Sequence, residues 1–182
     1  MFRSFLHRYI HRFERRYRYD GTYMHELADI SEAAFLRFAI MQTAGGGFGG
    51  GAPRDALCAA GIAGALVEDC GPCVQIASDM ALEAGMRGEV IAALLAGTAA
   101  DADAQLGLDF GRALLLATGD FDALRDEVER RWGKRALVAL SLRAMSARNF
   151  PVLKRAMGHA RTCQRVRIGN LDVAVNESLK AA

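Results

Sequence analysis

Two cysteines three residues apart are the side chains of this chain best suited to covalent chemistry. They stand in the segment Val67-Glu68-Asp69-Cys70-Gly71-Pro72-Cys73-Val74-Gln75. Two thiols at this spacing close a small disulfide ring, in which one thiol attacks a substrate and the other resolves the adduct. Pro72 is a favoured first residue of a helix, and the N-terminus of a helix favours a thiolate beside it. The pattern therefore predicts a redox-active CxxC pair at a helix N-terminus.

Two carboxylates come directly before this pair. Glu68 and Asp69 oppose thiolate formation by charge repulsion, but either one can accept a proton if it is partly buried. We therefore take Cys70, Cys73, Glu68 and Asp69 as the candidate catalytic residues. The sequence does not assign which cysteine attacks.

Two other interpretations of the cysteines remain open. A structural zinc site needs four ligands, usually from two such pairs, and here Cys58, Cys163 and His159 stand alone. Buried, inert cysteines are common, although two that flank Gly-Pro at a helix start are less easily accidental. We favour redox chemistry and expect no metal and no cofactor.

The composition indicates one folded domain. The chain has 182 residues, of which 52% are hydrophobic and 24% are charged, and this balance excludes a disordered chain. Its four cysteines are too few for a secreted disulfide scaffold. No apolar run approaches the roughly 20 residues that a membrane span needs. The net charge of +2 implies no nucleic-acid partner, and because no segment has the pattern of an export signal we expect a cytoplasmic protein with reduced thiols.

Apolar residues recur at helical spacing along most of the chain. The expected helices are 2–18, 25–42, 53–67, 72–84, 87–96, 101–117, 122–132 continuing through 134–149, and 151 to about 159. Asp29 or Ser31 is placed to cap the main part of the second helix, Pro151 starts the last one, and residues 166–168 form a short extended piece. The glycines of 45–51 satisfy GxGxxG formally, but no strand precedes them and no phosphate-binding lysine follows, so we expect a flexible connection. The fold class is all-α, a single-domain bundle of about seven or eight helices.

Residues 1–20 form a basic amphipathic helix that is distinct from the all-α domain of residues 21–182. Six arginines and two acids give the first segment a net charge of +4, which leaves −2 on the second. The apolar residues at helical spacing in it are Phe2, Phe5, Leu6, Tyr9 and Phe13. We expect this aromatic face to pack on a neighbouring subunit of a homo-oligomer. The alternatives are docking on its own domain and binding to a nucleic acid or, less favoured, to a membrane surface. We expect three histidines on this basic flank to be solvated, namely His7, His11 and His25.

Cys-Gly-Pro-Cys is also the active-site sequence of thioredoxins. That fold needs a strand before the motif and βαβ units around it. Residues 57–66 are instead an Ala/Gly-rich helical pattern, and no tryptophan precedes Cys70. The thioredoxin fold is therefore rejected, while the thiol chemistry is kept.

An Ala-rich helix, then Glu-Asp-Cys-Gly-Pro-Cys, then a helix that ends at Gly85 resembles the alkyl hydroperoxidase D-like (carboxymuconolactone decarboxylase) family. The stretch from Arg130-Arg131-Trp132-Gly133 to Gly158-His159-Ala160-Arg161 also looks like the later helices of a branch of that family, so the likeness covers about residues 25–165. The resemblance implies an all-α fold that assembles as homotrimers or hexamers of trimers. It also implies that Cys70 and Cys73 reduce peroxides and are recycled by a dedicated dithiol reductant.

The chain departs from the family pattern at two positions. Peroxidase members of the family have a histidine one helical turn after the second cysteine, where this chain has Ala77. They also have a glutamate about three turns upstream, in a region where this chain offers Cys58 and Asp55. The resemblance therefore implies a thiol pair without the family's Glu–Cys–His proton relay. The residues considered as substitutes are Glu68, Asp69, Gln75 and His159.

The sequence thus predicts a thiol-dependent peroxidase or disulfide reductase. Its partners would be a hydroperoxide or disulfide substrate and an external dithiol reductant. The missing histidine at Ala77 favours an alternative, a non-enzymatic all-α oligomer with a redox-sensing or structural role. A lyase of the carboxymuconolactone decarboxylase type fits less well, because that branch of the family works without a CxxC pair.

Overall fold

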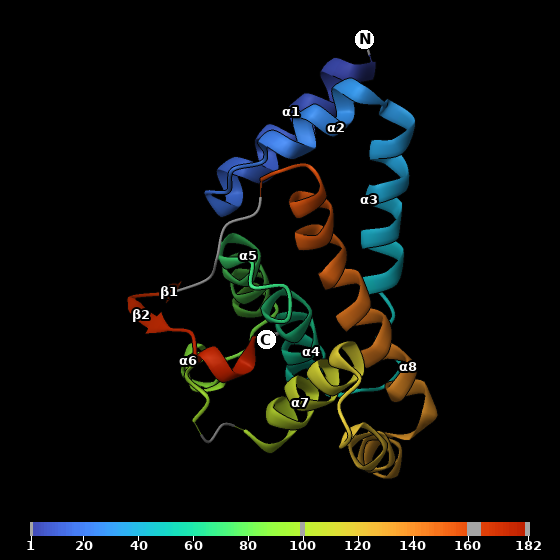
Figure 1. Ribbon diagram of the computed structural model, residues 1–182, viewed down its shortest axis with the longest axis vertical. Coiled ribbons are helices and arrows are strands. Elements are labelled where there is room, and N and C mark those ends of the chain that lie inside the picture. Colours follow the sequence, from blue (N-terminus) through green and yellow to red (C-terminus); the bar gives the residue numbers. More distant parts are fainter. Residues whose placement is uncertain (1, 99–100, 160–164, 181–182) are drawn as a thin grey trace.

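The computed structural model describes residues 2–98, 101–159 and 165–180, and it is all-α (Figure 1). The helices of these residues are α1 (Phe2–Tyr17), α2 (Thr22–Ile30), α3 (Glu32–Gly46), α4 (Arg54–Leu66), α5 (Gly71–Glu83), α6 (Gly88–Ala96), α7 (Ala102–Leu116) and α8 (Phe121–Ala156). They are followed by the strands β1 (Arg165–Ile168) and β2 (Leu171–Ala174) and a 3-10 turn, η1 (Glu177–Leu179). The predicted fold class is confirmed, with the CxxC pair at the start of α5. None of the helices in the described ranges is long and apolar enough to cross a bilayer.

The Ala/Gly-rich helix α4 forms the centre of the bundle, where it contacts α5, α7 and α8. Small residues allow these close contacts. A Cβ at Gly107 of α7 would overlap the backbone of Ala56, and a Cβ at Gly64 of α4 would overlap the backbone carbonyl of Ala144 in α8. The segment that was predicted as a helix over 53–67 is therefore the buried core helix, and larger side chains on it would push its neighbours away.

The helix predicted over 25–42 is two helices, and that prediction was wrong in its boundaries. The break falls at Ser31, whose backbone is extended with φ −162° and ψ 110°. The hydroxyl of Ser31 accepts a hydrogen bond from the N–H of Ala34 at 3.2 Å and caps the start of α3. Because this cap satisfies a helix start in mid-segment, α2 and α3 run in different directions (Figure 1).

The long helix α8 contains the break predicted after Trp132 but not the one predicted at Pro151. Gly133 has φ 81° and ψ 171°, a conformation that glycine adopts without steric cost. Pro151 lies inside the helix instead of starting a new one, although an interior proline removes a backbone hydrogen bond and crowds the preceding turn. The C-terminal half of α8 then reaches the α1–α2 pair (Figure 1), where Leu153 and Met157 pack against that pair.

The N-terminal helix α1 is confirmed, and within the single chain only part of its apolar face is covered. Leu6 and Ile10 are buried, whereas Phe2, Phe5 and Tyr9 are about half exposed, at 48%, 55% and 53%. α1 packs on α2, and at its C-terminal end it is tied to α5 by ion pairing, described below. An apolar strip of α1 therefore stays uncovered within the single chain.

The glycine-rich segment 45–51 is more structured than a flexible connection. Its first two glycines still belong to α3. Gly50 has φ +56°, and a Cβ there would overlap the backbone of Arg135 in α8. Close approach to α8 thus accounts for this glycine.

The predicted extended piece at residues 166–168 is confirmed as part of the hairpin of β1 and β2, in which Val166 and Ile168 face the core.

Candidate active site at the Cys70–Cys73 pair

Cys70 and Cys73 are paired as a disulfide at the N-terminus of α5, with their Cα atoms 5.2 Å apart. Cys70 is the extended residue that precedes the helix, with φ −102° and ψ 97°, and Pro72 lies in the first turn. The backbone carbonyl of Cys70 accepts the first helical hydrogen bond, from the N–H of Val74 at 2.9 Å. Both cysteine side chains are buried. The thiols therefore lie where the sequence predicts them, beside the unpaired N–H groups of a helix start.

A cavity of about 420 Å³ opens beside Cys73. Its described lining residues are Tyr9, Phe13, Tyr19, Gln42, Thr43, Gly46, Gly47, Cys58, Gly61, Ala65, Cys73, Ile76, Ala77, Met80, Arg143, Ser146, Ala147 and Phe150. This lining includes Cys73 but not Cys70, so the two thiols are in different positions relative to the cavity. The volume lies in the range of small-molecule sites, and the walls are mostly apolar, as such sites are.

Three polar or ionisable groups stand out in the cavity wall. Arg143 of α8 is the one described lining residue with a formal charge, and its Nη1 donates a hydrogen bond to the backbone carbonyl of Gly46 at 3.2 Å. The side-chain nitrogen of Gln42 is buried and has no hydrogen-bond partner among the described residues, which leaves a donor for a bound molecule. Burial raises the pKa of the Cys58 thiol, and the Arg143 charge opposes that rise.

The two candidate carboxylates are held outside this lining. The side chain of Glu68 is 4% exposed and forms ion pairs with Arg148 and Arg155 of α8. Asp69 lies in the turn before the pair with φ +47°, and it forms an ion pair with Lys180 at 3.1 Å. Neither carboxylate is among the described residues that line the cavity. Glu68 and Asp69 thus precede the cysteines in the sequence, but in the structure each of them is ion-paired with a basic side chain.

The other considered substitutes for the family relay also have partners elsewhere. Gln75 accepts a hydrogen bond from the backbone N–H of Arg167 at 2.8 Å and donates one to its carbonyl at 2.7 Å, so this amide anchors the hairpin. His159 lies 3.1 Å from Glu26. Ala77, at the position of the family histidine, does line the cavity. Cys163 lies outside the described residues.

Sequence reasoning missed Arg143, Gln42 and Cys58 as members of the site. Each lies on a helix other than α5, and only the packing of α3, α4 and α8 around α5 brings them to Cys73. A weak signal exists for Arg143, because it interrupts an apolar run in a helix that packs on a core helix. No comparable signal marks Gln42.

Comparison of the chain with protein-family models, with curated proteins and with solved structures finds no match.

Proposed function

We propose that this protein is a thiol-dependent peroxidase or disulfide reductase in which Cys73 attacks the substrate and Cys70 resolves the adduct. One observation carries the proposal: Cys73 lines a mostly apolar cavity of about 420 Å³, and Cys70, its disulfide partner, does not. A substrate in that cavity meets the sulfur of Cys73. The resemblance to the alkyl hydroperoxidase D-like family supports the same chemistry.

The first step of the proposed reaction consumes a hydroperoxide. The thiolate of Cys73 attacks the terminal oxygen of the O–O bond, so that an S–O bond forms as the O–O bond breaks. Cys73 becomes a sulfenic acid, and the other oxygen leaves with the bonding electron pair and takes a proton to give an alcohol or water. The Arg143 guanidinium in the same wall favours both the thiolate and the departing oxyanion.

The second step uses the CxxC spacing. The sulfur of Cys70 attacks the sulfenic sulfur of Cys73, the S–S bond forms and water leaves. The disulfide of the structure is this oxidised state. An external dithiol then reduces it by thiol–disulfide exchange and is itself oxidised, which completes the cycle. Because the cycle needs such a donor, we place the protein in the cytoplasm, where thiols are kept reduced.

The walls of the cavity favour an organic hydroperoxide over hydrogen peroxide. Phe13, Ile76, Met80 and Phe150 contribute apolar surface that stabilises a carbon chain by removing it from water. The unpartnered amide nitrogen of Gln42 is available to a polar group on the same molecule. The substrate class we propose is therefore an alkyl hydroperoxide, with its carbon chain on the apolar wall and its polar end near the Gln42 amide.

A second candidate is a non-enzymatic all-α redox module. The observation that favours it is Ala77, since none of the described residues of the cavity wall is a histidine. Without a proton carrier the pair would cycle slowly, and oxidation of Cys70 and Cys73 would then act as a signal or a structural lock.

The proposed enzyme is a homo-oligomer. Phe2, Phe5 and Tyr9 leave an apolar strip on α1 about half exposed, which is unusual for a helix that faces only water. Tyr9 also lines the cavity, so a neighbouring copy that covers this strip would lie close to the site.

The experiment is peroxide consumption with a small dithiol donor under multiple turnover. We expect the native chain to consume cumene hydroperoxide faster than hydrogen peroxide. Cys73→Ser and Cys70→Ser should each abolish turnover, since both thiols are needed for a full cycle.

The matched control is Cys58→Ser, which removes the other described thiol of the cavity wall. It should still form the Cys70–Cys73 disulfide after oxidation, as read by loss of two alkylatable thiols. Turnover that survives in both Cys70→Ser and Cys73→Ser would reject the enzymatic proposal. A fully oxidisable pair without turnover in the native chain would favour the non-enzymatic module.

A further inference from the structure

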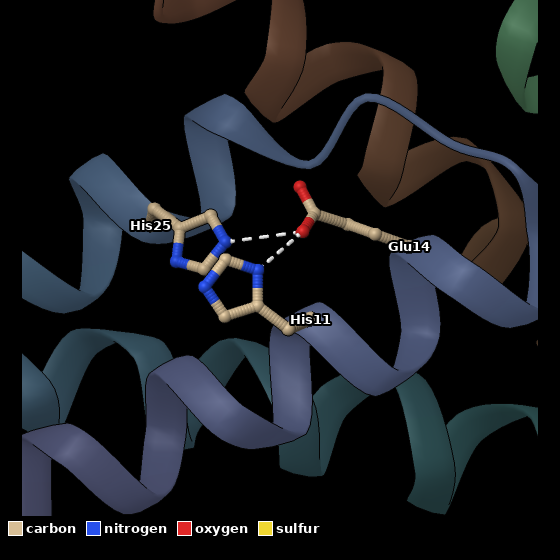
Figure 2. A group of neighbouring side chains, drawn as sticks. All are labelled: His11, Glu14 and His25. Carbon is tan, nitrogen blue, oxygen red and sulfur yellow. Dashed lines mark hydrogen bonds and ion pairs between the residues drawn. The ribbon is translucent and has the colours of Figure 1, made fainter.

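Three side chains at the α1–α2 contact converge on one point, far in sequence from the cysteines. His11 and Glu14 lie one turn apart on α1, and His25 faces them from α2 (Figure 2). The Oε2 atom of Glu14 lies 2.8 Å from Nδ1 of His11 and 3.4 Å from Nε2 of His25. The three ligand atoms all lie within 4.8 Å of one another. The expectation that these histidines are solvated holds for His11, which is 57% exposed, but not for His25, which is 18% exposed because α2 docks on α1.

His25 is oriented by a chain of contacts on its far side. Its Nδ1 lies 2.6 Å from Nδ1 of His7, and Nε2 of His7 lies 3.0 Å from the carboxylate of Asp29. A carboxylate only accepts, so His7 donates from Nε2 and, when neutral, accepts at Nδ1. With both rings neutral, His25 donates from Nδ1, and its Nε2 lone pair is then free to bind a metal ion beside Glu14. In the opposite tautomer His25 donates from Nε2 to Glu14. Metal-bound histidines have the first arrangement, with the second ring nitrogen donating to a fixed acceptor.

Glu14 is held in place by the backbone. Its Oε1 accepts a hydrogen bond from the N–H of Gly21 at 3.0 Å, which leaves Oε2 for the histidines. A Cβ at residue 21 would lie 2.9 Å from Oε1 of Glu14, so glycine makes room for the carboxylate. The acidic side chain is therefore positioned by the turn between α1 and α2 as well as by its own helix.

We propose that His11, Glu14 and His25 bind a divalent transition-metal ion of the zinc class. Two imidazoles and one carboxylate are ligands that Zn²⁺ takes in sites with one open position. Ligand atoms around a tetrahedral ion at about 2.1 Å lie about 3.4 Å apart, which is the separation of Glu14 and His25. The ligand atom of His11 lies 2.8 Å from that of Glu14, and the three atoms span at most 4.8 Å, so the His11 side chain must rotate for all three separations to reach the tetrahedral spacing. The bound ion links α1 to α2, and water occupies the fourth coordination position on the solvent side.

The competing explanation is that no metal ion binds and that a protonated, positively charged histidine is hydrogen-bonded to the Glu14 carboxylate. That arrangement needs no metal and gives no stoichiometric binding. The metal proposal is independent of the proposed thiol chemistry, because its readout is metal binding and not peroxide turnover.

The experiment is titration of tag-free, metal-stripped protein with Zn²⁺ and with Co²⁺ at pH 7.5, with the Cys70–Cys73 pair oxidised. We expect one equivalent of Zn²⁺ per chain and a rise in the melting temperature, since an ion bound only by the folded state stabilises it. The Co²⁺ complex should show no sulfur-to-cobalt charge-transfer band, which separates this site from the thiols. His11→Ala and Glu14→Gln should each weaken binding by more than about tenfold, the cost of losing even an outer partner.

His11 is 57% exposed, so His11→Ala keeps the fold and isolates the ligand. Asp29→Asn, which changes none of the three proposed ligands, should weaken binding by about tenfold. The matched control is His159→Ala, which removes a histidine that pairs with Glu26 outside the cluster and should bind Zn²⁺ as the native chain does. Absence of a stoichiometric site in the native chain, or full affinity in His11→Ala, would overturn the proposal.

Discussion

The side chains of Cys73 in α5 and Arg143 in α8 line the same cavity. Arg143 is the one described lining residue with a formal charge, so the mostly apolar cavity that Cys73 borders carries a positive charge in its wall. No local sequence feature near the CxxC pair supplies one, since Glu68 and Asp69 are both negative. In the proposed reaction, this arginine is the residue of the cavity wall that can stabilise negative charge on sulfur or oxygen.

Arg143→Gln should reduce turnover at neutral pH by about tenfold. An opposite charge near a thiol lowers its pKa by about one unit or more, and each unit changes the thiolate fraction about tenfold below the pKa. The measurement is the pH dependence of Cys73 alkylation in a Cys70→Ser background, with and without Arg143→Gln. Arg135→Gln is the matched control, because Arg135 is exposed on the same helix and stacks on Phe48. An unchanged alkylation profile in Arg143→Gln would remove Arg143 from the mechanism.

Glu68→Gln should lower the free energy of unfolding by about 2 kcal/mol. The Glu68 carboxylate is nearly buried and pairs with both Arg148 and Arg155, and loss of a buried charged partner costs more than loss of a surface pair. The arginines are themselves half exposed, so they regain water and limit the cost. Urea denaturation measures the change. Glu127→Gln, which removes a carboxylate from an exposed arginine cluster, should change the midpoint much less, and an equal change in the two variants would contradict the argument.

The parts of this fold that could be predicted are those with local causes. The Ala/Gly pattern predicts α4, Pro72 predicts the start of α5, and Gly133 predicts the break in α8. Ser31 was one of the two predicted caps and does cap α3, but the helix before it could not be predicted as separate, because the apolar spacing continues across the break.

The candidate site was predictable only in its thiol pair. The link between Cys73 and Arg143 depends on how α8 crosses α4 and α5, which is a matter of tertiary packing. The histidine cluster likewise needs α2 to fold back on α1. The spacing of His11 and Glu14 places them on one helix face, but nothing in the sequence brings His25 to that face.

The contact between α1 and α5 should weaken in acid. Arg16 hydrogen-bonds and ion-pairs with Glu83, and this contact, with a hydrogen bond from Tyr17, outweighs burial and lowers the pKa of Glu83. Because the pKa of Glu83 is lower in the folded state, its carboxylate stabilises the fold at pH values above its unfolded pKa of about 4.3. This contribution is lost as the pH falls through the folded-state pKa. Glu83→Gln should therefore lower the urea midpoint at pH 7, and this effect should shrink as the pH falls below about 4.3. A difference that stays the same as the pH falls would show that the charge is not the cause.

The exposed strip of α1 should mediate assembly. Replacing Phe2 and Phe5 together with serine removes much of the apolar area that this helix exposes, so we expect a smaller mass by light scattering than for the native chain. Leu171→Ser is the control, because Leu171 is 50% exposed on β2 and lies on another element. An unchanged mass in the Phe2 and Phe5 variant would place the interface elsewhere.

The most direct test of the central claim is to trap the first intermediate on a single cysteine. In Cys70→Ser the resolving thiol is gone, so one equivalent of cumene hydroperoxide should convert Cys73 to a sulfenic acid that reacts with dimedone. Peptide mass spectrometry should then find the adduct on Cys73, with release of one equivalent of alcohol. An adduct on Cys70 in Cys73→Ser with none on Cys73 in Cys70→Ser would reverse the assignment. No adduct in either variant would contradict the account.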